Sequence, residues 1–223
     1  MRLNKVKLSS VLLLCFGLTG LQGQAIKDID GNVYNTINIG KQVWIVENLK
    51  TTKYNDGTTI PLVSDIIEWG SLTTPGYCLY NYNIDESTYM NTYGVMYNWY
   101  SVNTGKLCPK GWHVPTDADW TTLTTYLGGE NVAGDKLKET GTVHWKGSKT
   151  VATNESGFTA LPGGLRDDYG AFDFLAVQGH WWSSTGYDKG NSWRRGVSSL
   201  YSDVFRRANP KAYGYSVRCL KDN

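Results

Sequence analysis

The sequence is poor in the residues that build metal sites and common catalytic sites. It contains only three histidines, which lie far apart and lack the closely spaced ligand-type neighbours of a zinc site: His113, His144 and His180. It also lacks a Gly-x-Ser-x-Gly elbow, a phosphate-binding loop and a paired-glycine dinucleotide fingerprint. We therefore expect no metal, no cofactor and no catalytic residues of these kinds.

Long apolar runs and an excess of positive charge are also missing. After Leu21, no segment approaches the roughly 20 apolar residues that a membrane-spanning helix needs, so we expect no transmembrane segment. The chain has 22 basic and 20 acidic residues, without a basic stripe that could neutralise a phosphate backbone. Nucleic acid is therefore not an expected partner.

The first 23 residues have the layout of a secretory signal peptide. Three positive charges precede an apolar run over residues 11–21, and small or neutral residues follow it. Cleavage after Gly23 and cleavage after Ala25 both fit this pattern. We expect residues 1–23 to be removed, which leaves a nearly neutral chain that is secreted or held at the cell surface.

A lipoprotein is the alternative interpretation of this segment. Cys15 would then be the acylated residue, but Leu14 before it is bulkier than the small residue expected there, and apolar sequence continues beyond it.

The remaining residues, 26–223, contain no linker, charge block or repeat, and their number suits a single domain with a substantial core.

Hydrophobic periodicity predicts a mixed, turn-rich domain. Short runs of β-branched and aromatic residues on either side of Gly40 predict a β-hairpin over residues 33–49. Apolar residues at helical spacing predict three helices, over residues 93–104, 117–127 and 131–140. Thr116 and Asp119 resemble a capping box before the second helix, whereas Gly134 weakens the third. Turn signals and short strands dominate the last third of the chain.

Five phrases carry a family resemblance along most of the chain: DGNVYNTINIGKQVWIVENL, YGVMYNWYSVNTGKLCPKGWHVPTDADW, ESGFTALPGGLR, WWSST and GYSVRCLKD. In this order they resemble the Fibrobacter succinogenes major paralogous domain, a family of secreted or surface proteins of Fibrobacter and Bacteroides bacteria. The similarity runs from about Asp28 to Asp222. The family brings no established reaction with it.

The order of elements is also similar to that of the C-type lectin-like fold. In both, helices are followed by a glycine-rich region and antiparallel strands, and GYSVRCLKD resembles the closing strand. The resemblance implies an α+β fold of the C-type lectin-like type, with few short helices, short antiparallel strands and long loops. An N-terminal β-hairpin region precedes it.

Three cysteines remain once Cys15 is removed, and an exported chain is free to oxidise them. The lectin-like resemblance implies a disulfide between Cys108 and Cys219. It leaves Cys78 as a buried thiol in the apolar segment GYCLY. The alternative is that all three thiols stay reduced and are packed in the core.

Ligand loops of a lectin-like fold would emerge after the phrase PGGLR. This gives a set of candidate ligand-binding residues: Asp167, Asp168, Tyr169, Asp173 and Trp181. Trp181 belongs to the set because strand alternation would turn it outward if Trp182 is buried. The calcium and sugar triplets of lectins are absent, which argues against calcium-dependent sugar binding. Three arginines are interpreted as buried bridges between strands or loops: Arg166, Arg195 and Arg218.

Two functional hypotheses follow. The first is a non-catalytic secreted or surface module that binds a carbohydrate or a surface protein through its lectin-like loops. The heavy load of 9 Trp and 15 Tyr supports it, since exposed rings stack on sugars, although most of these rings should form the core. The second is a cell-envelope or extracellular hydrolase or modifying enzyme whose carboxylates meet only in three dimensions.

Overall fold

The N-terminal part of the domain is a pair of antiparallel hairpins. The computed structural model describes residues 25–80 and 84–222, so the expected signal peptide lies outside the described residues. The first hairpin joins β1 (Ile26–Lys27) to β2 (Val33–Tyr34), and the second joins β3 (Thr36–Ile39) to β4 (Gln42–Ile45). Gly40 makes the turn of the second hairpin with a φ of 61°. The predicted opening hairpin is therefore confirmed.

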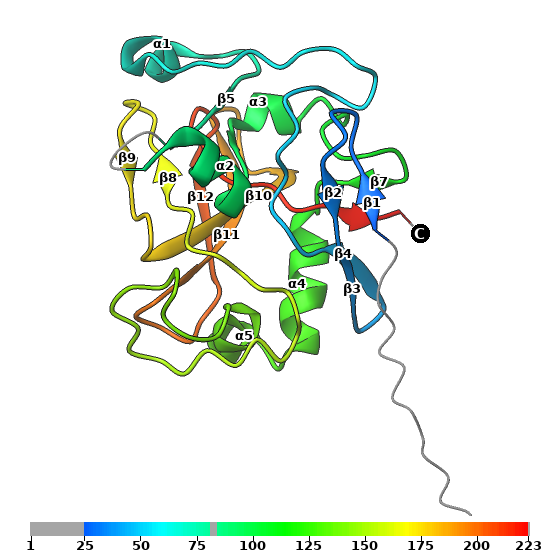
Figure 1. Ribbon diagram of the computed structural model, residues 1–223, viewed down its shortest axis with the longest axis vertical. Helices are drawn as coiled ribbons and strands as arrows, with labels where there is room; N and C mark the ends of the chain where they lie inside the picture. The colour runs from blue at the N-terminus through cyan, green and yellow to red at the C-terminus, as the bar shows by residue number, and fades with distance from the viewer. Residues whose placement is uncertain (1–24, 81–83, 223) are drawn as a thin grey trace, which may run out of the picture.

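The C-terminal end of the chain completes this N-terminal sheet. Strand β13 (Leu220–Lys221) lies between β4 and β7 (Trp112–His113), antiparallel to both (Figure 1). Cys219, just before β13, is joined by a disulfide to Cys108, just before β7. This is the pair that the resemblance implied, and Cys78 remains a free, buried thiol.

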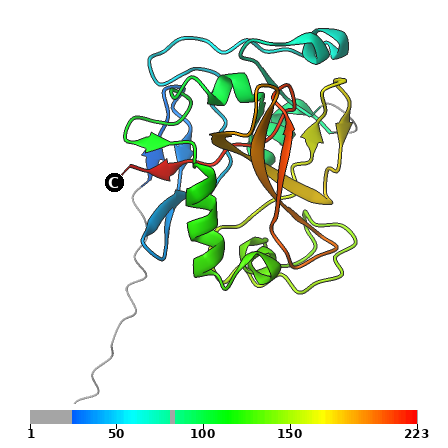
Figure 2. The ribbon, with the colours of Figure 1, turned by 180° about the vertical axis from the view of Figure 1, so that it is seen from behind.

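A three-stranded antiparallel sheet forms the other half of the molecule. Its strands are β10 (Gln178–Gly186), β11 (Asn191–Ser198) and β12 (Phe205–Pro210), in that order. Helix α4 (Asp117–Tyr126) contacts β10 and β11 and stands beside the sheet, as Figure 2 shows from behind. One face of the sheet is thus covered by α4.

Two of the three predicted helices are present. The Thr116 hydroxyl accepts from the Asp119 backbone N–H, and the Asp119 carboxylate accepts from Thr116, so α4 has the predicted capping box. Helix α5 (Glu130–Leu137) matches the third prediction but ends three residues earlier. A Cβ on Gly134 would lie 2.4 Å from the Asp203 carbonyl oxygen, so this glycine lets α5 approach the backbone of a neighbouring loop.

The predicted helix over residues 93–104 is wrong. This segment contains the end of α2 (Glu86–Tyr93), the strand β6 (Met96–Tyr97) and the one-turn helix α3 (Trp99–Val102). Gly94 ends α2 with a φ of 77°, and a side chain there would meet the Leu49 carbonyl oxygen at 2.6 Å. The apolar residues of this segment have helical spacing, but they are buried by different parts of the chain and not along one helix face.

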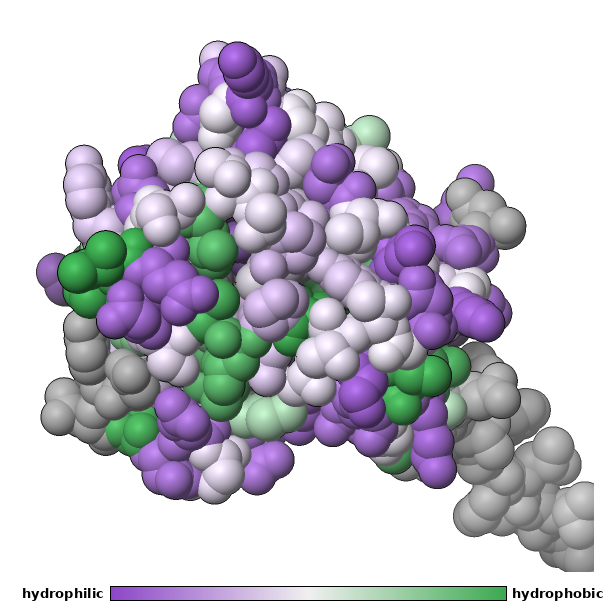
Figure 3. Space-filling view, turned by 90° about the horizontal axis from the view of Figure 1, so that it is seen from above, coloured by the Kyte–Doolittle hydropathy of each residue, from purple (hydrophilic) through white to green (hydrophobic). Residues whose placement is uncertain are grey.

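Short elements complete the fold, which is α+β with five short helices in the described residues and antiparallel strands in small sheets. The remaining elements are α1 (Ile66–Ser71), β5 (Tyr77–Cys78), β8 (Leu165–Arg166) and β9 (Phe172–Asp173). Apolar side chains gather over the α1 side of the face in Figure 3. Within α1, Ile67 is 80% exposed.

Aromatic rings and buried arginines hold the core together. Trp44, Trp120 and Phe158 form one aromatic cluster, with ring centroids 4.9–5.9 Å apart. The guanidinium of Arg218 stacks on Phe158 and donates to its carbonyl oxygen, and Arg166 donates to four carbonyl oxygens of two loops. Arg195 pairs with carboxylates of α4 and α5. The interpretation of all three arginines as buried bridges is confirmed.

Candidate functional site

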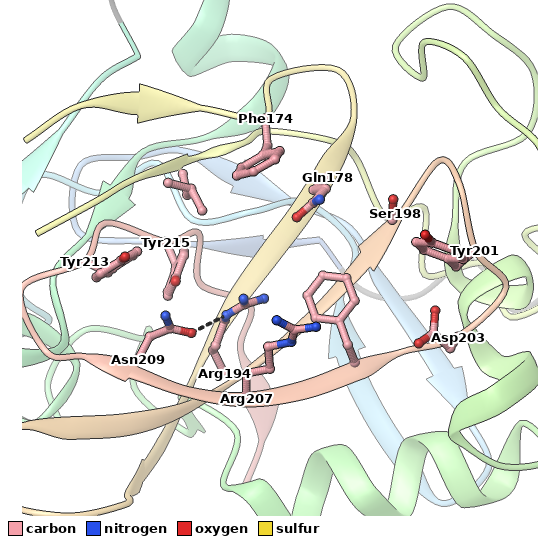
Figure 4. Close-up of a pocket in the computed structure, with 12 residues that line it drawn as sticks. Phe174, Gln178, Arg194, Ser198, Tyr201, Asp203, Arg207, Asn209, Tyr213 and Tyr215 are labelled. Atoms are coloured by element: carbon pink, nitrogen blue, oxygen red, sulfur yellow. Dashed lines mark hydrogen bonds between the residues drawn. The ribbon is translucent and has the colours of Figure 1, made fainter.

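A cavity of about 530 Å³ opens on the face of the β10–β11–β12 sheet that α4 does not cover. Figure 4 shows the lining side chains converging on it from the sheet and from neighbouring segments. The sheet contributes Gln178, Arg194, Ser198, Phe205, Arg207 and Asn209. Strand β8 contributes Leu165, and the loops contribute Phe174, Tyr201, Asp203, Tyr213 and Tyr215. Aromatic walls with a few polar groups are typical of sites for small ligands.

Strand register explains why these sheet residues share one face. Arg194 on β11 lies opposite Arg207 on β12, and Phe205 lies opposite Gly196. Because side chains alternate along a strand, Arg194 and Arg207 point to the cavity while Arg195 and Arg206 point to α4. Phe205 can lie over β11 because Gly196 has no side chain: a Cβ there would meet the ring at 2.2 Å.

Arg194 is the most constrained polar residue of the cavity. Its Nε donates to Asn209 Oδ1 at 2.8 Å, the bond drawn in Figure 4, and its Nη1 donates to His180 Nδ1 at 2.9 Å. The guanidinium stacks 4.8 Å from the Phe205 centroid and 5.4 Å from that of Tyr215. Burial lowers the pKa of Arg194, with repulsion by Arg207 adding to the effect. A guanidinium nevertheless keeps its charge in proteins, so the cavity floor is cationic.

His180 lies under this floor as a neutral imidazole. It is buried among the rings of Phe174, Phe205 and Tyr215, whose centroids lie 5.3–6.4 Å away. Burial, and then the charge of Arg194, holds the pKa of His180 well below 6.5. Since Arg194 can only donate, Nδ1 must accept, and the ring proton is on Nε2.

The two arginine pairs of β11 and β12 differ in their charge compensation. On the α4 side, Arg195 and Arg206 both pair with Asp117, at 2.9 and 2.8 Å, and Arg195 also pairs with Glu130. On the cavity side, neither Arg194 nor Arg207 forms an ion pair with any carboxylate in residues 25–80 and 84–222, which include every Asp and Glu of the chain. The cavity therefore has two positive charges that form no ion pair, although Asp203 also lines it.

Helix α5 holds the loop at one end of the cavity. The buried Lys138, which follows α5, donates to the carbonyl oxygens of Ser198 and Tyr201 at 2.9 and 2.8 Å. It also forms an ion pair with Asp135 at 2.8 Å. These contacts fix the backbone of Ser198 and Tyr201, whose side chains line the cavity next to Asp203.

The structure places four of the predicted ligand residues on the β8–β9 hairpin, outside the lining of this cavity. Asp167, Asp168 and Tyr169 form the turn of the β8–β9 hairpin, and Asp173 ends it. The Asp167 carboxylate accepts from the backbone N–H groups of Tyr169 and Ala171, so it stabilises the turn. This hairpin reaches the cavity through Leu165 and through Phe174, which follows β9, so the four predicted residues are not among its lining.

The start of this turn lies near a lining residue, Tyr213, because Arg166 and Gly214 exchange backbone hydrogen bonds. Burial raises the pKa of Tyr213, a lining residue, and the charges of Asp168 and Asp167 add to the effect. The predicted residues thus adjoin the site, whereas the residues that line it come mainly from β11, β12 and the following loop.

The prediction that Trp181 points outward is wrong. Trp181 is 2% exposed, packs against Trp120 and Phe158, and donates from Nε1 to Asn48 Oδ1 at 2.8 Å. Trp182 is fully buried, as predicted, and donates to the Tyr97 carbonyl oxygen. Alternation failed as a guide to exposure because both faces of β10 are covered at this point.

Sequence reasoning missed the cavity-lining arginines. Their signal lies in two doublets, Arg194-Arg195 and Arg206-Arg207, on consecutive strands. In an antiparallel pair, each doublet must send one arginine to each face. Only the register shows that Arg194 and Arg207 meet.

In the described part of the chain, no group of three or more His, Cys, Asp or Glu side chains is arranged to hold a metal ion. None of the helices described is long and apolar enough to cross a membrane.

Comparison with known proteins identifies one relationship. The family model described as the Fibrobacter succinogenes major domain matches residues 37–221, which is most of the chain. No curated protein and no solved structure matches the chain.

Proposed function

The chain belongs to the Fibrobacter succinogenes major domain family, and from that premise we propose that it is a non-catalytic module that binds a carbohydrate in the cavity on β10–β11–β12. The observation that carries this proposal is the composition of the cavity, where aromatic rings alternate with amide, hydroxyl and guanidinium groups. Sugars present apolar faces to aromatic rings and hydroxyl groups to hydrogen-bonding side chains.

The size of the cavity favours a saccharide over the other expected ligand, a surface protein. About 530 Å³ falls within the range of roughly 300–1,000 Å³ typical of small-ligand sites. A stable protein interface instead buries about 800 Å² on each partner. Glycoside hydrolysis needs two carboxylates about 5–10 Å apart. Asp203 is the one carboxylate in the lining described, so the lining supports binding.

The proposal includes the fold type and the location. A C-type lectin-like arrangement is supported by the α+β architecture and by the disulfide that ties the last strand to the segment before β7. The signal-peptide layout of residues 1–23 supports a secreted or cell-surface protein.

A glycan and polysaccharide array probed with residues 26–223 tests the function, with a matched pair of variants. Tyr201 lines the cavity and is 63% exposed, whereas Tyr187 is 56% exposed and lies outside the lining. We expect Tyr201→Ala to weaken binding of an array hit by about threefold to tenfold, the range for loss of one aromatic contact. Tyr187→Ala should leave it unchanged. The proposal fails if no glycan binds or if both variants bind equally well.

A further inference from the structure

We propose that the saccharide is acidic, and that Arg194 and Arg207 bind its carboxylate or sulfate group. This inference rests on the proposed function and names the ligand class of the same cavity. The carrying observation is the contrast between the two arginine pairs on the same two strands. The pair facing α4 is fully matched by Asp117 and Glu130, and the pair facing the cavity has no acidic partner among the described residues.

Burying a positive charge without a counterion costs free energy, so we expect an anionic group of the ligand to supply the missing negative charge. Arg194 is nearly buried, and a neutral histidine and an asparagine hold it in place. These two contacts use Nε and Nη1 and leave further N–H donors of the planar guanidinium for a ligand. Arg207 is exposed beside it, and both guanidinium groups lie over the ring of Phe205, at 4.8 and 5.9 Å from its centroid.

The geometry also gives the ligand an orientation. Figure 4 shows Tyr201 and Asp203 at one end of the cavity, Asn209 and Tyr213 at the other, and the two arginines between these ends. Asp203 Oδ1 is buried without a hydrogen-bond partner. A sugar hydroxyl could donate to it, whereas a second acidic group would be repelled. A saccharide with its anionic substituent at the arginines and a free hydroxyl group toward Asp203 would pair with the charged groups at both places.

A set of three trisaccharides, measured by calorimetry, separates charge from sugar recognition. The set consists of a galacturonic acid trisaccharide, a sulfated galactose trisaccharide and the uncharged galactose trisaccharide. We expect at least one acidic member to bind more than tenfold more tightly than the neutral one, and its affinity to fall as salt rises from 0.05 to 0.5 M. The member that binds identifies the group as a carboxylate or a sulfate.

Neighbouring arginines on β12 provide matched variants. Arg207→Gln removes one uncompensated charge and should weaken the acidic trisaccharide by about tenfold or more. Arg206→Gln, one residue away, breaks a pair with Asp117 on the opposite face and should change the affinity less than twofold. Arg206 and Arg207 are both exposed, so we expect both variants to fold, and thermal melting of each checks this.

The outcomes distinguish the two proposals. Equal affinity for acidic and neutral trisaccharides, or equal effects of Arg206→Gln and Arg207→Gln, would overturn the acidic ligand and leave carbohydrate binding in place. If neither these trisaccharides nor any glycan of the array binds, the proposed function itself is overturned.

Discussion

His180 is a neutral side chain that burial keeps from taking up a proton. Its folded-state pKa is well below 6.5, so below pH 6.5 the unfolded chain binds a proton that the folded chain refuses. The free energy of unfolding should therefore fall by up to about 2 kcal/mol between pH 6.5 and pH 5 through this residue alone. We expect His180→Gln, which keeps an acceptor for Arg194, to show a flatter pH slope in urea unfolding. Identical slopes would show that folding does not lower the pKa of His180.

Single residues also mark the limit of what could be predicted. Trp182 was correctly expected in the core, since its ring is large and apolar. Trp181 was expected outside because alternation assumes that one face of a strand meets solvent, and at β10 neither face does. Burial of neighbouring residues on both faces depends on what packs there from distant segments, which no local pattern contains.

At the scale of elements, the contact between α5 and the loop of Tyr201 depends on one glycine. Helix propensity alone predicts that Gly134→Ala stabilises the protein by about 1 kcal/mol. The added Cβ would lie 2.4 and 2.6 Å from the carbonyl oxygens of Asp203 and Ser202, so we expect a loss of about 1–3 kcal/mol instead. Gly190→Ala, whose nearest neighbour is 3.8 Å away, is the control. A higher melting temperature for Gly134→Ala would contradict this packing.

Elements with their own local signals were predicted best. Helix α4 has its cap, its apolar face and its stop within one short segment, and the opening hairpin has its turn glycine. The segment of residues 93–104 has helical spacing, yet Gly94 and the pairing of β6 with β5 divide it. The cavity was missed for the same reason, because it depends on the register between β11 and β12.

At the scale of the whole molecule, the disulfide between Cys108 and Cys219 spans 111 residues. In the chain-entropy model, closing a loop of this length stabilises the folded protein by about 4–5 kcal/mol. We expect the double variant Cys108→Ala, Cys219→Ala to lose about this much free energy of unfolding in denaturant titrations. Reductant should destabilise the original protein similarly and leave the double variant unchanged. An effect of reductant on the double variant would contradict the assignment.

Cys78 should not interfere with that comparison. Burial raises the pKa of its thiol to about 12, so little reactive thiolate is present near neutral pH. Its position in the core also keeps oxidants and alkylating reagents away from it while the protein is folded.

The position of β13 between β4 and β7 determines when the N-terminal sheet can form during synthesis. The ribosome makes β4 early and β13 after every other strand described, so the N-terminal sheet has a vacant place until residues 220–221 have emerged. The bond between Cys108 and Cys219 has to wait for the same moment. Partly made chains therefore expose unpaired strand edges, which favour association with other chains. Closure of the N-terminal sheet therefore depends on a segment that is made after all the other described strands.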